Sequence, residues 1–345
     1  MQSLINLISN NTPLIDIRSP SEFIKGATPM SVNYPILLDS DREIVGKTYK
    51  EFGNDKAVEI GHELISGSKK NKIIDRWLKF IENNPKAKLY CARGGQRSKI
   101  AKDWINKRGV EIKIIRGGFK TLRNTCIRAL NQVVDDKKEW LIIAGKTGNH
   151  KTKLIENLRN GINLEKLANH RGSAFGANKT AQPTPINFEN SLAYDYLNIN
   201  DQWIALEDES RRIGRLVIPE SFFKKMNSSN IVVIDQDIET RITNIYDEYV
   251  NQELVKTDPQ LLLKKLREQL KMITKKLGNK HYKMIDELLI IAFTKNSVQK
   301  HFEWIEMLLK KYYDKMYSYQ LSNKKTRCIF KGNYLEVHNY LEQKT

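Results

Sequence analysis

The sequence has few cysteines and no long apolar run. Three cysteines in 345 residues are too few for a disulfide framework, so a reducing compartment is expected and any cysteine with a role acts as a thiol. No apolar stretch approaches the roughly 20 residues of a membrane helix. The N-terminus lacks the basic start and apolar core of a signal peptide. These absences predict a cytoplasmic protein that uses no membrane.

The composition is that of a folded protein, and the sequence contains no internal repeat. It contains 40% hydrophobic, 28% charged and 9% aromatic residues, which excludes a disordered, collagen-like or membrane-spanning chain. The length suggests two domains, with room for a small third.

Positive charge is in excess, with a net charge of +18. Residues 1–135 carry 24 basic and 14 acidic side chains, residues 136–240 carry 14 of each, and residues 241–345 carry 20 and 12. Excess lysine and arginine favours a polyanion, most commonly nucleic acid. A lysine-rich genome is the alternative explanation. The two basic ends favour a surface for one partner that spans both.

Short apolar runs alternate with helical patterns over residues 1–130. Strands are expected at 13–18, 32–35 and 112–118, with another in KLYCARGG. Helical spacing in AVEIGHELISG and NKIIDRWLKFIENN lies between them. Strands that alternate with helices predict a parallel sheet, in which ligands bind beyond the C-terminal strand ends.

A second α/β unit follows the charged segment VVDDKKEW. WLIIAGKTGNHKTKLIENLRNG is typical of a strand, a loop and a helix, and QWIALEDES and NIVVIDQD are further strands. From about residue 253 the pattern is helical and basic. The predicted fold class is therefore α/β, with domains at 1–132 and 136–250 and a basic helical region at 251–345.

Cys91 ends a predicted strand and precedes a helix. Backbone N–H groups and the helix dipole at such a loop favour an anion, and arginines favour thiolate over thiol. Cys91 is therefore a candidate nucleophile; the alternative is a buried structural cysteine. Cys126 and Cys328 lack this setting and are expected to be packing residues. The residues expected to form the anion cradle are Arg93, Gly94, Gly95, Arg97 and Ser98.

This loop and the upstream segment LIDIRSPSEFIKGATP resemble a rhodanese domain. The matching features are Asp16-Ile17-Arg18, Glu22-Phe23, Gly26-Ala27 and the loop that ends in Arg97-Ser98. Five residues separate Cys91 from Arg97, which is the spacing of cysteine-dependent phosphatases. The wide loop suits a tetrahedral anion better than a lone sulfur, so phosphatase chemistry remains an alternative.

LIIAGKTGNHKT approximates the phosphate-binding pattern G-x4-G-K-S/T. His150 stands where the second glycine belongs. The alternative is a chance glycine turn between a strand and a helix. The candidate diphosphate-binding residues are Gly145, Thr147, Gly148, Lys151 and Thr152.

Two polar strings follow this loop. LANHRGSAFG is suited to an anion, and ALEDESRRIG places carboxylates at a strand end, where one could hold Mg²⁺ near Thr152 and Asp208. The alternatives are a glycine turn and a helix cap. The residues expected to support the anion or nucleic-acid site are His170, Arg171, Ser173, Glu207, Asp208, Glu209 and Arg211.

Taken in order, these motifs resemble the tRNA 2-selenouridine synthase family. A rhodanese domain with CARGGQRS is followed by the degenerate phosphate loop, then ANHRGSAFG, then EDESRRIG. The resemblance extends through VGKTYKEFGNDKAVEIGHELI and YYDKMYSYQ, so that it covers nearly the whole chain. It implies a rhodanese-like domain followed by a P-loop-like domain.

The resemblance also implies an activity. The family replaces the sulfur of wobble 2-thiouridine in tRNA by selenium from selenophosphate, and it geranylates that sulfur with geranyl diphosphate. By resemblance, Cys91 serves selenation, the loop around it holds selenophosphate, and the second loop holds the geranyl donor. Both donors are co-substrates, and no tightly bound cofactor is expected. The expected partners are tRNA carrying 2-thiouridine and a selenophosphate-producing enzyme, with the chain itself a monomer.

A third hypothesis is a tRNA-binding module without catalysis. In each case tRNA binding is expected to depend on salt, through basic residues near Cys91 and lysines of the 264–283 stretch. These lysines are Lys264, Lys265, Lys271, Lys275, Lys276, Lys280 and Lys283.

Overall fold

The chain forms two compact units in a computed structural model, which describes residues 2–172, 175–176, 180–317 and 324–344. The first unit comprises Met1–Val133 with Pro183–Asn200, and the second comprises Val134–Gln182 with Asp201–Thr345. The α/β fold class with parallel sheets is confirmed. Among the described helices, none combines the length and apolarity needed to cross a bilayer.

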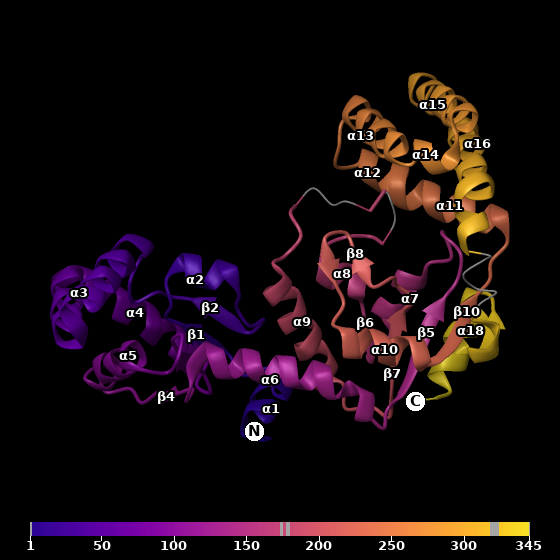
Figure 1. Cartoon of the computed structure of the whole chain (residues 1–345). Helices are drawn as coiled ribbons and strands as arrows, with labels where there is room; N and C mark the ends of the chain where they lie inside the picture. The colour runs from indigo at the N-terminus through magenta and orange to yellow at the C-terminus, as the bar shows by residue number, and fades with distance from the viewer. Residues whose placement is uncertain (1, 173–174, 177–179, 318–323, 345) are drawn as a thin grey trace. The chain divides into compact units, whose positions relative to one another are not determined.

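The first unit is built on a four-stranded parallel sheet with the order β2-β1-β3-β4 (Figure 1). Ile15, Leu89, Trp77 and Trp104 are buried in its core. The strands are β1 (Leu14–Asp16), β2 (Ser31–Asn33), β3 (Lys88–Tyr90) and β4 (Lys113–Ile114). The helices are α1 (Gln2–Ser9), α2 (Pro20–Lys25), α3 (Asp39–Leu64), α4 (Gly67–Asn83), α5 (Gln96–Asn106), α6 (Gly118–Gln132) and α9 (Pro185–Asn198).

Helix α9 joins the first unit although its sequence lies inside the predicted 136–250 domain. Asn187 Oδ1 accepts from the Ala27 N–H at 2.7 Å, and Asn190 Nδ2 donates to the Ala27 carbonyl at 2.6 Å. Arg123 of α6 forms an ion pair with Glu189 and a hydrogen bond with Asn190. These contacts between segments distant in sequence explain why the first unit includes Pro183–Asn200, which lies outside the predicted 1–132 domain.

The second unit contains a five-stranded parallel sheet with the order β11-β10-β5-β7-β6. After β5 the chain forms β6 and β7, which lie on one side of β5 in the strand order. It then forms β10 and β11, which lie on the other side of β5. The C-terminal end of β5 is therefore the switch point where ligands bind in such sheets. The strands are β5 (Glu139–Ala144), β6 (Gly161–Ile162), β7 (Trp203–Glu207), β10 (Asn230–Ile234) and β11 (Cys328–Gly332), besides a hairpin of β8 (Arg212–Ile213) and β9 (Leu216–Val217). Nearby helices are α7 (Lys151–Asn157), α8 (Leu164–Ala168), α10 (Glu220–Ser228) and α18 (Tyr334–Glu342).

Strand β11 also differs from the sequence analysis, which expected only helices after residue 253. It pairs in parallel with β10, where Phe330 and α18 residues Val337 and Leu341 pack against the sheet core. A five-residue strand flanked by lysines and arginine has no clear alternation of apolar residues, so periodicity alone does not reveal it.

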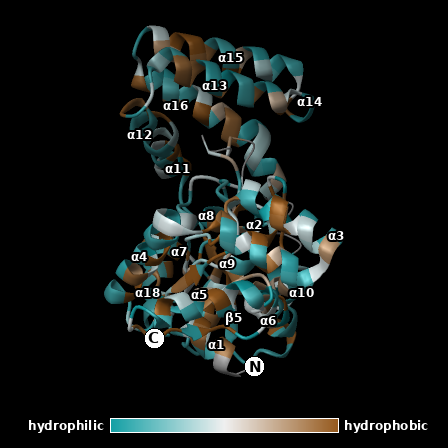
Figure 2. Ribbon diagram, turned by 90° about the vertical axis from the view of Figure 1, so that its left-hand side faces the viewer, coloured by the Kyte–Doolittle hydropathy of each residue, from teal (hydrophilic) through white to brown (hydrophobic). Residues whose placement is uncertain are grey.

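The basic helices form a bundle within the second unit. Its core includes Leu266, Leu289 and Trp304, and Figure 2 shows hydrophilic and hydrophobic residues interspersed along α13, α15 and α16. Asp258 caps α13 by accepting from the N–H groups of Gln260 and Leu261. The elements are α11 (Ile238–Tyr246), η2 (Asp247–Asn251), α12 (Gln252–Leu254), α13 (Pro259–Met272), α14 (Thr274–Leu277), α15 (Asn279–Thr294), α16 (Val298–Leu308) and η3 (Leu309–Tyr313).

Candidate active site: the cysteine loop and the phosphate loop

Cys91 lies directly after β3, at the base of the loop that leads into α5. Its side chain is buried, with 3% of its surface exposed. Burial alone would raise the pKa of the thiol, but the Ser98 hydroxyl, the N–H groups of Arg93 and Ser98 and the charge of Arg97 together lower that pKa. The structure therefore places Cys91 in a setting that favours the thiolate.

The loop after Cys91 leaves several backbone donors available. In the described hydrogen bonds, the N–H groups of Gly94, Gly95, Gln96 and Arg97 have no acceptor. They precede or begin α5, a helix of 11 residues, whose N-terminus adds positive potential. This arrangement is an anion cradle beside the thiol. Arg93 is exposed, whereas Ser98 is buried.

Arg97 is held by Glu22 of α2. Its two terminal nitrogens donate to the two carboxylate oxygens at 2.6 and 3.1 Å. Although burial opposes it, Arg97 lowers the pKa of Glu22. The Glu22 carboxylate also accepts from the Ser19 N–H at 3.1 Å, which caps α2. Glu22 belongs to the rhodanese-like pattern in the sequence, but no spacing pattern predicts its contact with Arg97.

A second glycine turn supports the loop from below. Gly94 and Gly118 both have positive φ, and a Cβ atom at Gly118 would lie 2.1 Å from the Cys91 carbonyl oxygen. The N–H of Phe119 donates to that carbonyl at 2.9 Å. Close approach of two backbones therefore requires glycine here. The sequence pattern predicts only a strand end at Gly117-Gly118 and no contact with the cysteine loop.

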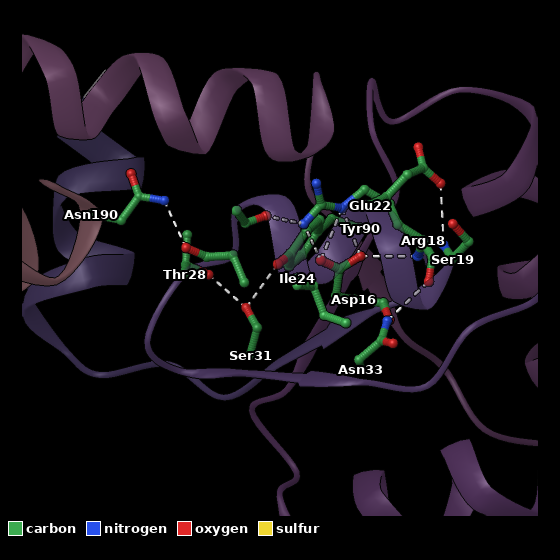
Figure 3. Close-up of polar contacts among 12 residues, drawn as sticks. Asp16, Arg18, Ser19, Glu22, Ile24, Thr28, Ser31, Asn33, Tyr90 and Asn190 are labelled. Atoms are coloured by element: carbon green, nitrogen blue, oxygen red, sulfur yellow. Dashed lines mark hydrogen bonds and ion pairs between the residues drawn. The ribbon is translucent and has the colours of Figure 1, made fainter. Parts of the chain in front are cut away.

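Asp16 and Arg18 form a buried ion pair (Figure 3). Arg18 donates to both Asp16 oxygens and to the Gly26 carbonyl. Its guanidinium carbon lies 3.8 Å from the centre of the Phe119 ring. Because Phe119 holds the Cys91 carbonyl, this pair fixes the backbone beneath the thiol.

The phosphate loop follows β5 in the second unit. Gly145, Gly148 and His150 have positive φ, so His150 adopts the left-handed conformation that favours glycine. The His150 ring contacts Tyr334 edge to face, with centroids 6.4 Å apart. Lys151 Nζ donates to the carbonyls of Gly145 and Lys146 at 2.8 and 3.3 Å.

Helix α11 holds this loop in place. Arg241 has only 3% of its side chain exposed, donates to the Thr147 carbonyl at 2.8 Å and forms a bidentate ion pair with Asp314. Asn244 donates to the Gly148 carbonyl at 2.8 Å. No sequence motif pointed to Arg241, because it lies on a helix 94 residues from Thr147.

A pocket of about 490 Å³ opens at the loop. Several residues predicted to bind phosphate or an anion line this pocket, together with residues that no motif indicated. The predicted residues at the pocket are Thr147, Gly148, Lys151, Thr152, Arg171 and Glu209. The Thr152 hydroxyl donates to Glu165 at 3.1 Å. The missed residues at the pocket include Glu165, Lys166, Glu248, Tyr249 and Tyr317.

Other predicted residues lie outside this pocket. Asp208 forms an ion pair with Lys324 at 2.5 Å, and the exposed Arg211 lies 3.9 Å from Glu220. The side chain of Glu207 is buried, and its Oε1 has no partner in the described part of the chain. His170 Nδ1 is buried and likewise without a described partner. Ser173 lies outside the described residues.

Carboxylates crowd the end of β7. Burial, Glu165 and Glu209 raise the pKa of Glu207, and burial and Glu165 raise the pKa of Glu209 to about 8. Within the described residues, no group of three or more His, Cys, Asp or Glu side chains is arranged to hold a metal alone.

The two units thus define a class: a protein with a rhodanese-like thiol domain joined to a phosphate-loop domain. Comparisons with known proteins agree. A rhodanese-like domain model matches residues 1–125, and a tRNA 2-selenouridine synthase AAA domain model matches residues 138–345.

Similar proteins extend this match over nearly the whole chain. A tRNA 2-selenouridine synthase of Sulfurovum sp. (strain NBC37-1) is 40% identical, covering 98% of this chain and 96% of its own. One of Shewanella frigidimarina (strain NCIMB 400) is 39% identical over the same shares. The chain belongs to the tRNA 2-selenouridine synthase family, a family of tRNA-modifying enzymes. The resemblance stated from the motifs is confirmed.

Proposed function

We propose that the protein is a transferase that replaces the sulfur of wobble 2-thiouridine in tRNA by selenium from selenophosphate, after geranylation of that sulfur. The observation that carries this proposal is the thiol of Cys91 beneath a cradle of backbone N–H groups. Such a cradle suits the phosphate oxygens of selenophosphate, and the thiolate lies at its base.

The selenation step acts on the geranylated nucleoside. Selenium attacks C2 of the uracil ring, the C2–S bond breaks, and geranyl thiol leaves. Water cleaves the Se–P bond and releases phosphate, and N3 of the base gains a proton. Geranylation of the sulfur favours this displacement, because the alkylated sulfur is a better leaving group from C2 than the unmodified sulfur. In this chain, the cradle and Arg97 would hold selenophosphate. The Cys91 thiolate would lie next to the selenium atom of this donor.

The geranylation step is assigned to the phosphate loop. Lys151 and the loop N–H groups would bind the diphosphate of geranyl diphosphate, and the nucleoside sulfur would displace it from the geranyl carbon. A loop that binds a leaving diphosphate need not hydrolyse a nucleotide, so His150 is compatible with this use.

The pocket also fits Mg²⁺ bound together with the diphosphate. Thr152 and Glu165 would hold the ion, which would neutralise charge on the leaving group. Asp208 does not fit this role, because the Lys324 ammonium group already occupies its carboxylate. We assign the ion to Thr152 and Glu165 for that reason.

The remaining partners follow from this chemistry. The protein would act as a monomer in the cytoplasm on tRNA that carries 2-thiouridine. A selenophosphate-producing enzyme would supply one donor, and no tightly bound cofactor is required.

Nucleoside mass spectrometry tests the proposal. Purified protein, 2-thiouridine tRNA and both donors should yield 2-selenouridine. Omission of selenophosphate should leave the geranylated nucleoside. No change of the tRNA with either donor would contradict the proposal, and rapid aryl phosphate hydrolysis that needs Cys91 and Arg97 would favour a phosphatase instead.

A further inference from the structure

The first unit contains a cavity that the proposed steps have not used. Its volume is about 740 Å³. Gly53 interrupts α3 with φ of 82° and ψ of −171°, and residues from both halves of that helix line the cavity together with α5. Its walls include the buried apolar residues Ala57, Ile65 and Trp104. Apolar walls with a few polar groups are typical of ligand pockets of this size.

Two residues at the end of the cysteine loop lie on the lining of the cavity. Gln96 and Arg97 line the cavity, and their N–H groups belong to the loop that begins at Cys91. Arg42, Lys47 and Lys50 also lie on its lining. Glu43 lies on the lining as well and pairs with Lys47. A ligand that fits here has an apolar body and lies next to the thiol loop.

One reactant of the proposed function has this form. During selenation, C2 of the geranylated uracil must reach the donor held by the Cys91 loop, so its geranyl chain must lie close to the same loop. A ten-carbon chain needs about 300 Å³ if each carbon group takes the volume of a water molecule. The cavity is large enough and adjoins the correct loop.

We propose that this cavity binds the geranyl chain of the S-geranyl-2-thiouridine intermediate during selenation. The inference rests on the proposed function and deepens it. It makes the first unit the site that selects the alkylated nucleoside, because apolar contact with the chain adds binding that 2-thiouridine itself does not receive.

The test compares anticodon stem-loops that differ only at sulfur. The full-length protein is titrated with a stem-loop carrying S-geranyl-2-thiouridine and with one carrying S-methyl-2-thiouridine. The wild type should bind the geranyl form at least tenfold more tightly. Val58 lines the cavity, and Val58→Trp should abolish that preference while affinity for the S-methyl form stays unchanged, which also shows that the variant is folded.

Ile44→Trp is the matched control. Ile44 lies on the same helix but is 45% exposed and lies outside the cavity lining, so this variant should keep the preference. An unchanged preference in Val58→Trp would overturn the inference. So would a Val58→Trp defect confined to binding of free geranyl diphosphate.

The two proposals fail in different ways. If the wild type produces neither geranylated nor selenated nucleoside, the proposed function fails. If it produces both but binds the two stem-loops equally, only the cavity inference fails.

Discussion

At the scale of residues, the reactivity of Cys91 depends on a few polar neighbours that offset its burial. The Ser98 hydroxyl is one of them. Because the pKa of Cys91 is lowered, its thiolate is present at lower pH than in an ordinary cysteine, whose pKa is about 8.5. Ser98→Ala should raise that pKa and reduce the thiolate fraction at neutral pH.

Iodoacetamide alkylation as a function of pH measures this effect. Cys328 is exposed and should be replaced by serine in both proteins, whereas burial raises the pKa of Cys126 to about 12 and keeps it unreactive. The midpoint for Cys91 should move to higher pH in Ser98→Ala. An identical midpoint in the two proteins would show that Ser98 does not favour the thiolate.

Many of the candidate residues could be predicted from the sequence because they are local. Cys91, its glycines and Arg97 share one loop, and Lys151 and Thr152 share another, so spacing alone brings them together. Glu22, Arg241 and Asp314 act across long separations, where no spacing pattern exists. Asp208 is expected from the sequence near Thr152, but its carboxylate pairs with Lys324, which lies 116 residues away in the sequence.

At the scale of elements, the turn between β4 and α6 supports the cysteine loop. Gly118→Ala should destabilise the protein by more than the roughly 1–3 kcal/mol of a strained backbone, since its Cβ would also meet the Cys91 carbonyl. Gly109→Ala is the control, because Gly109 has φ of +80° but a Cβ atom there would meet nothing within 4 Å. Urea unfolding should show a larger loss for Gly118→Ala, and equal losses would contradict the close-approach argument.

The ion pair between α11 and the segment after η3 should stabilise the phosphate loop. Asp314→Asn leaves the charge of the buried Arg241 without its partner, and the free energy of unfolding should fall by about 2–3 kcal/mol. The Michaelis constant for geranyl diphosphate should rise, because Arg241 also holds the Thr147 carbonyl.

Asp286→Asn gives a comparison in the same bundle. Asp286 forms a bidentate pair with Arg267, which is 44% exposed, and such pairs contribute about 0–1 kcal/mol. If both variants lose the same stability and keep the same Michaelis constant, Arg241 does not position the loop.

The elements themselves were largely predictable. The alternating strands and helices of residues 1–130, and β5, β7 and β10, appear where apolar runs predicted them. Strand β11 and helix α9 required tertiary information: β11 forms only because β10 offers an edge, and α9 packs on a segment more than 150 residues away.

At the scale of the whole molecule, the excess positive charge should appear as salt-dependent tRNA binding. In the basic region, Lys275 and Lys276 lie in α14, and Lys280 and Lys283 lie near the start of α15. Replacing all four by glutamine should weaken binding, and the slope of log affinity against log salt should fall by about one for each lost phosphate contact.

A second variant with the same charge change separates contact from net charge. Lys56, Lys107, Lys224 and Lys310 each pair with a nearby carboxylate, and their replacement by glutamine should leave the slope unchanged. Equal losses in the two variants would mean that net charge alone attracts the tRNA. No dependence on salt in the wild type would contradict the account of the basic regions.

The central claim is that the Cys91 loop carries selenation and the phosphate loop carries geranylation. The most direct test quantifies 2-thiouridine, its geranyl derivative and 2-selenouridine in one reaction containing both donors. Cys91→Ser should accumulate the geranylated nucleoside, whereas Lys151→Ala should leave 2-thiouridine but still selenate tRNA that is already geranylated. Formation of 2-selenouridine by Cys91→Ser at the wild-type rate would contradict the claim.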